Sequence, residues 1–427
     1  MGWFDSIEHN RWLSGHMQAL IEEAEGAIVA TGFAHLDADG KPDPTRSIDL
    51  AVTGRMAYVF SLGALMGLPG TRRYADHAVK ALTNYFTDPV NGGMWFAIKP
   101  EPDEDGHGVP WDEASRVKSQ YHTVYALLGV AAATVADRPG AHELLRDAMA
   151  AQERWWWDKA FNMPVESYAA DFTDPEDYRG INAAMHTVEA LLVTADVTGE
   201  GKWLERAIQI TDFAVNRQAR NHGWRLPEHY DTDWRPRLDY NEDQPAHPFR
   251  PYGVTPGHGL EWSRLTVQAH AALKDRSLPA PDWMLQAAER LFAQARADGW
   301  KRDGAPGFVY TTDFEGTPIV HERMHWVVCE GISAAAAVHR ALLDAGRSRD
   351  DVQSYEDLYR SWLDYAEQYV IETPGVWTHE LDASNAPSTR TWAGHPDVYH
   401  ALQATLMSRL PVGPSMCKAL AEGLLDS

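Results

Sequence analysis

Cysteine is almost missing from this chain of 427 residues. Its two cysteines, Cys329 and Cys417, cannot build the disulfide framework that is typical of small secreted proteins. Runs of apolar residues stay shorter than the 18 or so that a membrane-spanning helix requires. The first residues also lack the basic and apolar regions of a secretory signal. We therefore expect a cytoplasmic protein with no membrane partner.

Positive charge is also scarce, because 38 Lys and Arg stand against 61 Asp and Glu, for a net charge of −23. A phosphate backbone repels such a surface, which argues against a nucleic-acid partner. The sequence contains no glycine-rich phosphate loop, no dinucleotide fingerprint and no Gly-x-Ser-x-Gly turn. We expect no cofactor.

What the sequence does contain is a long repeat. At intervals of 64 to 72 residues a polar residue introduces an apolar segment with helical spacing. A fixed period indicates repeat architecture, and each period is long enough for two helices and a connection. The six polar residues are Arg55, His122, His186, His258, His325 and His395.

More highly charged amphipathic stretches alternate with these apolar segments, as expected for helices with one solvated face. They are Asn10–Ile28, Arg73–Phe86, Ala141–Trp157, Trp203–Gln218, Pro281–Ala297 and Tyr355–Ile371. Short Gly- and aromatic-rich segments, such as those at 92–97, 223–228, 307–312 and 375–380, read as strands on one rim. The sequence predicts an all-α (α/α)6 barrel, formed by residues 1–427 as one domain, with the loop 229–256 at the same rim and a last short helix near 416–425.

In such a barrel the polar residues that begin the inner helices meet at one end. A single histidine at a helix start is usually a cap or a satisfied buried group. Five in equivalent places favour an active site, because buried imidazoles are costly without hydrogen bonds. Glu189 and Glu261 follow His186 and His258 by one helical turn, where a carboxylate raises the basicity of an imidazole. We therefore expect general acid–base catalysis.

His321-Glu-Arg-Met-His325 matches the His-Glu-x-x-His zinc motif. That motif requires both histidines on one helix, whereas the repeat begins the helix near His325. We expect no metal here, although a site built from several rim histidines stays open. A rim pocket of histidines, carboxylates, arginine and aromatic rings suits a sugar.

Four segments resemble the N-acylglucosamine 2-epimerase superfamily, and within it the branch of mannose and sulfoquinovose isomerases. The most specific is Thr255-Pro-Gly-His258-Gly-Leu-Glu261-Trp. The others are Thr53-Gly-Arg55-Met, Asn182-Ala-Ala-Met-His186-Thr-Val-Glu and Trp392-Ala-Gly-His395-Pro-Asp-Val-Tyr. The resemblance implies isomerisation of a monosaccharide, such as D-mannose to D-fructose, through a cis-enediol without a cofactor. We expect a monomer or homodimer.

The resemblance also implies roles for particular residues. It makes His258 and His395 the acid/base pair. It assigns sugar oxygens to Arg55, Asn182, His186 and Glu261. We add the remaining pocket candidates from their place at the rim: Tyr121, Glu228, Arg250, His325 and Trp392.

Several other functions stay open at this point. A sugar 2-epimerase of the mannose/glucose or cellobiose type shares the enediol, and sulfoquinovose isomerase would need a cationic subsite. His325-Trp-Val-Val stands where epimerases of the superfamily often show Lys-x-Trp-Trp, which favours an isomerase. Glycoside hydrolases and polysaccharide lyases also use (α/α)6 barrels, and a hydrolase would need two carboxylates at the site. A non-catalytic sugar-binding protein would not need two bases.

Overall fold

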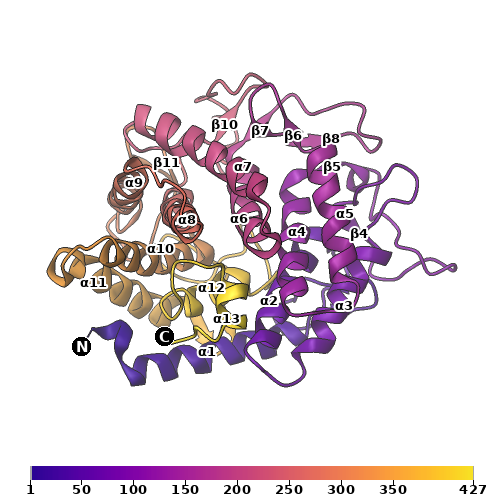
Figure 1. Cartoon of the computed structure of the whole chain (residues 1–427), viewed down its shortest axis with the longest axis horizontal. Helices are drawn as coiled ribbons and strands as arrows, with labels where there is room; N and C mark the ends of the chain where they lie inside the picture. The colour runs from indigo at the N-terminus through magenta and orange to yellow at the C-terminus, as the bar shows by residue number, and fades with distance from the viewer. Residues whose placement is uncertain (1, 427) are drawn as a thin grey trace.

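Six inner helices form a ring, and a second ring of helices surrounds it (Figure 1). The computed structural model describes residues 2–426. The inner helices are α2 (Leu50–Leu65), α4 (Gln120–Val135), α6 (Ile181–Thr198), α8 (Pro256–Asp275), α10 (His325–Asp344) and α12 (Tyr399–Leu406). The outer helices are α1 (Ile7–Glu25), α3 (Thr71–Asn84), α5 (Ala141–Arg154), α7 (Gly201–Thr211), α9 (Trp283–Gly299) and α11 (Arg349–Tyr365). Contacts of α12 with α2 close the inner ring, which confirms the predicted (α/α)6 barrel.

Small residues let the inner helices pack closely. A Cβ added to Gly54 of α2 would lie 2.5 Å from the carbonyl carbon of Tyr125 in α4, so only glycine fits there. Gly129 of α4 meets the carbonyl of Gly54 in the same way. The Ala- and Gly-rich composition of the inner segments therefore reflects backbone-to-backbone packing. The outer helices α7 and α11 each continue into a π-helical segment, Asp212–Ala219 and Ala366–Val370.

A circle of short antiparallel ladders forms the rim. In each, residues just before an inner helix pair with the loop that leads to the next inner helix. Bridges from Val254 to Thr312 and from His395 to Leu36 complete the circle. The rim pairs are β3 (Ile48–Asp49) with β4 (Ala97–Ile98), β5 (Lys118–Ser119) with β8 (Ser167–Tyr168), β9 (Arg179–Gly180) with β10 (His229–Tyr230), and β13 (Arg323–Met324) with β16 (Glu380–Leu381). The remaining pairs are β1 (Ile28–Val29) with β2 (Gly32–Phe33), β6 (Trp157–Asp158) with β7 (Met163–Pro164), β11 (Thr311–Thr312) with β12 (Pro318–Val320), and β14 (Ile371–Thr373) with β15 (Val376–Trp377).

The polar residues of the repeat do not all occupy the same place, which corrects the expectation of equivalent positions. Arg55 and His186 are the sixth residues of their helices, while His325 is the first residue of α10. His395 lies before α12 altogether. The backbone of His395 exchanges hydrogen bonds of 2.8 and 3.0 Å with Leu36, so this residue belongs to a rim ladder.

Among the described residues, α10 is the one helix long and apolar enough to cross a membrane by length and composition. In the structure 78% of its apolar window is buried, as in a core helix. Cys329 of α10 and Cys417 are both buried and free. Cys417 belongs to the short last helix α13 (Met416–Ala421), which lies near the predicted position and packs against α2 and α4.

Candidate active site

A cavity with an empty volume of about 990 Å³ opens at the rim where the inner helices begin. Its size is that of a site for a small molecule. The loop 229–256 contributes Pro248, Phe249 and Pro251 to the wall, as predicted. Eight of the predicted site residues line it: Arg55, Tyr121, Asn182, His186, His258, Glu261, His325 and Trp392. The cavity is also lined by His35, Asp49, His122, Trp326, His379, Asp397 and His400.

His258 is held by a buried carboxylate. Its Nδ1 lies 2.8 Å from Oε2 of Glu228, and Oε1 of Glu228 accepts from the backbone N–H of Thr255 just before α8. An ionised carboxylate can only accept, so Nδ1 of His258 carries the hydrogen and Nε2 is left with a lone pair. Glu228 itself is not among the residues that line the cavity. It acts on the site through His258.

His400 is held in the same manner by a residue of α10, the helix that packs between α8 and α12. Its Nδ1 lies 2.9 Å from Oε1 of Glu330, a fully buried residue of α10. His400 is the second residue of α12 and lines the cavity. Two imidazoles, each oriented by a carboxylate, are therefore brought to one cavity from α8 and α12.

Trp326 lies between these two histidines. The centroid of its ring is 5.2 Å from that of His258 and 6.0 Å from that of His400. The indole lines the cavity, so it offers a flat apolar face between the two bases. Such a face suits the C–H side of a sugar chain.

Arg55 is fixed by three partners. It donates to Asp397 at 2.8 Å, to the hydroxyl of Tyr121 at 3.1 Å and to that of Tyr125 at 2.7 Å. Asn182 contrasts with it, because its buried Oδ1 has no hydrogen-bond partner among the described residues. An unpaired buried acceptor in the wall of a cavity is available to a ligand hydroxyl.

Below the cavity, the guanidinium of Arg264 contacts three carboxylates. Its nitrogens lie 2.9 Å from Glu330, 3.1 Å from Glu261 and 3.4 Å from Glu189. Burial, together with the negative charge of Glu330, raises the pKa of Glu261 well above its usual value, so we treat Glu261 as a neutral acid. Burial opposes ionisation of Glu189, but the hydrogen bond from His186 and the charge of Arg264 outweigh it and lower its pKa.

The same cluster contains the group that could best hold a metal ion. One ligand atom each from His186, Glu189 and Glu261 lies within 4.8 Å of the others. Arg264 already contacts both carboxylates, so its guanidinium balances their charge in this arrangement.

The prediction that His321 lies in the loop before α10 is confirmed. Its Nδ1 lies 2.9 Å from Oδ2 of Asp303.

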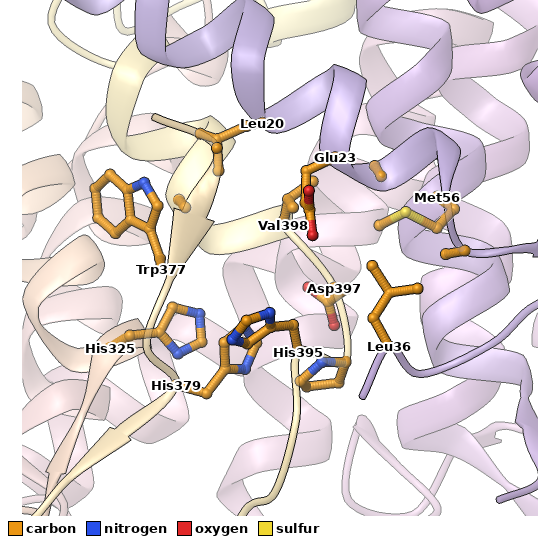
Figure 2. Close-up of a pocket in the computed structure, with 15 residues that line it drawn as sticks. Leu20, Glu23, Leu36, Met56, His325, Trp377, His379, His395, Asp397 and Val398 are labelled. Atoms are coloured by element: carbon orange, nitrogen blue, oxygen red, sulfur yellow. The ribbon is translucent and has the colours of Figure 1, made fainter. Parts of the chain in front are cut away.

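His395 lies behind the cavity. It lines a smaller pocket of about 420 Å³ that reaches toward Leu20 and Glu23 of α1 (Figure 2). The residues found to line the central cavity do not include His395. The two spaces adjoin, because both are lined by His325, His379, Pro396 and Asp397. The prediction named His395, which lines the smaller pocket, whereas His400, five residues further along the chain, lines the central cavity.

Four histidines of the wall are poor bases. Burial lowers the pKa of His325 to about 3 and that of His186 and His122 to about 4. Burial and the neighbouring histidines also push the pKa of His379 well below its usual value. These rings stay neutral at pH 7, where they can exchange hydrogen bonds with sugar hydroxyls.

Arg250 does not line the cavity, contrary to the prediction. It pairs with Glu176 at 2.7 Å and lies 3.9 Å above the ring of Tyr178. These contacts anchor the loop that carries Phe249, whose ring meets Trp392 at 5.1 Å across the mouth. Arg250 therefore supports the wall from outside.

A repeat in the sequence could have found one residue that the prediction missed, and the structure shows a second correspondence. The pair Tyr399-His400 repeats Tyr121-His122 at the start of another inner helix. His379 corresponds to Glu228, since each of their carbonyls accepts the first N–H of an inner helix at 3.0 Å.

Comparisons with known proteins identify the family of the chain. The N-acylglucosamine 2-epimerase family model matches residues 32–404. A D-mannose isomerase from Thermobifida fusca is 44% identical over 422 residues, with 98% of each chain covered. A D-mannose isomerase from Pseudomonas cannabina pv. alisalensis is 38% identical over 421 residues, covering 98% of this chain and 97% of the relative. A crystal structure of D-mannose isomerase superposes with a TM-score of 0.82 at 24% identity, covering 96% of this chain and 99% of the other. The chain belongs to the N-acylglucosamine 2-epimerase family.

Proposed function

We propose that the protein is a D-mannose isomerase that interconverts D-mannose and D-fructose. The observation that carries this proposal is the pair of imidazoles, His258 and His400, each bound through Nδ1 to a buried carboxylate and facing one cavity. Relatives named D-mannose isomerase, 44% and 38% identical over nearly the full chain, support the substrate.

The reaction requires a base that works on both C1 and C2 of the open-chain sugar. One imidazole Nε2 removes the proton from C2, and the electrons of that bond form the C1–C2 double bond of a cis-enediol. The same nitrogen returns the proton to C1. The other histidine moves a proton between the oxygens on C1 and C2, and assists opening of the ring. We assign this pair of roles to His258 and His400, and not to His395, because His400 lines the cavity.

The remaining wall residues bind the sugar. Arg55, Asn182, His186 and the neutral acid Glu261 offer donors and acceptors to hydroxyl groups. Trp326 supports the carbon chain between the two bases.

The charge of the wall favours a neutral sugar over sulfoquinovose. Of the described residues that line the cavity, Arg55 is the one with a permanent positive charge, and it is engaged with Asp397. A sulfonate would need a free cation to offset its desolvation. The ionised carboxyl of Asp49, whose pKa is lowered by its hydrogen bond from His35 despite burial, would repel it further.

Proton NMR of the purified, EDTA-treated protein with D-mannose in D2O tests the proposal. We expect D-fructose to appear, with some deuterium at C1. D-glucose as the main product would make the protein a 2-epimerase, since an epimerase reprotonates C2 of the same enediol. If mannose stays unchanged and sulfoquinovose reacts, the assignment of a neutral substrate is wrong.

A further inference from the structure

Arg264 connects parts of the site that are far apart in the sequence. It is 1% exposed, and its side chain runs from α8 to Glu189 of α6 and to Glu330 of α10. Glu330 uses its two oxygens for two partners, Oε2 for Arg264 at 2.9 Å and Oε1 for His400 at 2.9 Å. Arg264 is thus connected to the proposed base His400 through a single residue, Glu330.

The buried carboxylates need that guanidinium. Glu189, Glu261 and Glu330 are at most 6% exposed, and burial alone disfavours their charged forms. The charge of Arg264 is the first influence that offsets burial at Glu330 and lowers its pKa. Without Arg264, the ionised side chains of Glu189 and Glu330 would lie in the core without this counter-ion, and they would take up protons.

Other groups around the cluster do not replace this charge. The ionisable residues that act on these carboxylates or on His400 are Arg55, Tyr58, Tyr125, His186, His325, Cys329, His379, Asp397 and Tyr399. Burial keeps the tyrosines, the thiol and these histidines uncharged at neutral pH. Arg55 is bound to Asp397 at 2.8 Å. Arg264 therefore supplies the main positive charge beside Glu189 and Glu330.

The state of Glu330 decides which nitrogen of His400 can act. An ionised Glu330 accepts a hydrogen bond, so the hydrogen of His400 sits on Nδ1 and the lone pair on Nε2. A protonated Glu330 could donate its hydrogen to Nδ1 instead. The hydrogen of the ring would then sit on Nε2, which could not remove a proton from carbon.

We propose that Arg264 is a positioning residue that acts through Glu330, holding His400 in the tautomer that presents Nε2 as a base. For its effect on turnover this role rests on the proposed isomerase function. The tautomer itself does not depend on any substrate.

The kinetic test compares the pH dependence of kcat/KM for Arg264→Met, Arg264→Lys, Glu330→Gln and the double variant. In Arg264→Met, Glu330 must lose a proton before His400 can act, so the acid limb should move up by about one pH unit or more. Arg264→Lys keeps the charge, so its acid limb should stay near that of the wild type. In Glu330→Gln the imidazole has lost its anion, so the limb should move down. The double variant should follow Glu330→Gln.

A uniform loss of activity at every pH in Arg264→Met would overturn the proposal, because it would indicate a structural role alone. An upward shift in Arg264→Lys as large as in Arg264→Met would overturn it too. If Arg264→Met fails to fold by circular dichroism, the lysine variant and Glu330→Gln carry the test.

A second readout needs no activity. Long-range 1H–15N NMR of protein labelled in histidine distinguishes the two neutral tautomers, and a His400→Asn variant assigns the signal. We expect hydrogen on Nδ1 in the wild type and on Nε2 in Arg264→Met at pH 7. The same tautomer in both proteins would contradict the role of Arg264, whatever sugar the enzyme uses. Failure of mannose turnover with the expected tautomers would reject only the proposed function.

Discussion

His325 stacks on His379 with ring centroids 3.8 Å apart and an angle of 29° between the planes. Both rings are more than nine-tenths buried in the wall of the cavity. Protonating either ring would place a positive charge against its neighbour. The relationship therefore links the pH of the solution to the stability of the rim.

The first prediction is a loss of stability in acid. Burial lowers the pKa of His325 from 6.5 to about 3 in the folded protein, so the unfolded chain binds a proton first as the pH falls. The contribution of neutral His325 to the free energy of unfolding is complete above about pH 6.5 and is lost progressively toward pH 3. A pKa difference of this size costs about 3 kcal/mol by pH 4.5. Urea unfolding at pH 7.5 and pH 4.5 should show a smaller difference for His325→Gln than for the wild type.

His142→Gln is the matched control, because His142 is exposed on the outer helix α5. It should keep the acid dependence of the wild type. An equal acid dependence in His325→Gln would mean that other groups, such as His186 or His122, dominate.

The second prediction separates two histidines five residues apart. His400→Asn should lower kcat for mannose by about 100-fold or more, as expected for loss of a general acid–base group. His395→Asn should stay within about tenfold of the wild type, because His395 lines the neighbouring pocket. Steady-state kinetics with fructose detection measures both variants. A larger loss in His395→Asn than in His400→Asn would restore the assignment made from the sequence.

The fold could be predicted from the sequence because its cause is periodic. The alternation of apolar and amphipathic helices repeats six times, and closing the ring is the way to bury every apolar segment. The rim ladders were expected only as short strands, since two-residue pairs such as Asp49 with Ala97 leave almost no pattern.

The sequence predicts only part of the site, because the contacts of the site do not follow the repeat. His258 sits in a specific local motif, so it could be named. The sequence does not point to His400, because the spacing of the repeat favours His395. In the structure the loop before α12 is long, and the backbone of His395 pairs with Leu36 in a rim ladder. The partners Glu330 and Arg264 lie 66 residues apart on different helices, and only the rotation of those helices brings them together.

The third prediction concerns the protonation of Glu261. Burial and the charge of Glu330 raise the pKa of Glu261 well above its usual value, so the side chain should be a neutral acid at pH 7. Glu261→Gln keeps the shape and a donor group, and should retain activity within about tenfold. Glu261→Ala should lose more, since it leaves Arg264 with one partner fewer. Infrared difference spectra should show a protonated carboxyl band in the wild type that is missing in Glu261→Gln. Two results together would mean that Glu261 is ionised: a large loss of activity in Glu261→Gln, and no protonated carboxyl band in the wild type.

The fourth prediction is discrimination against a charged sugar of the same stereochemistry. D-Mannose 6-phosphate adds a dianion to the proposed substrate, and a buried anion without a partner is strongly unfavourable. Arg55 cannot serve it without leaving Asp397, which it contacts at 2.8 Å. We expect kcat/KM for the phosphate to be lower by about 100-fold or more, an effect of roughly 3 kcal/mol. D-Lyxose, which lacks C6, is the control. If lyxose is converted well and the phosphate poorly, the added phosphate group, and not a missing contact of the C6 hydroxyl, is the cause. If both are poor, the enzyme needs the C6 hydroxyl itself. Equal use of mannose and its phosphate would show that the wall has a cationic subsite that opens on binding.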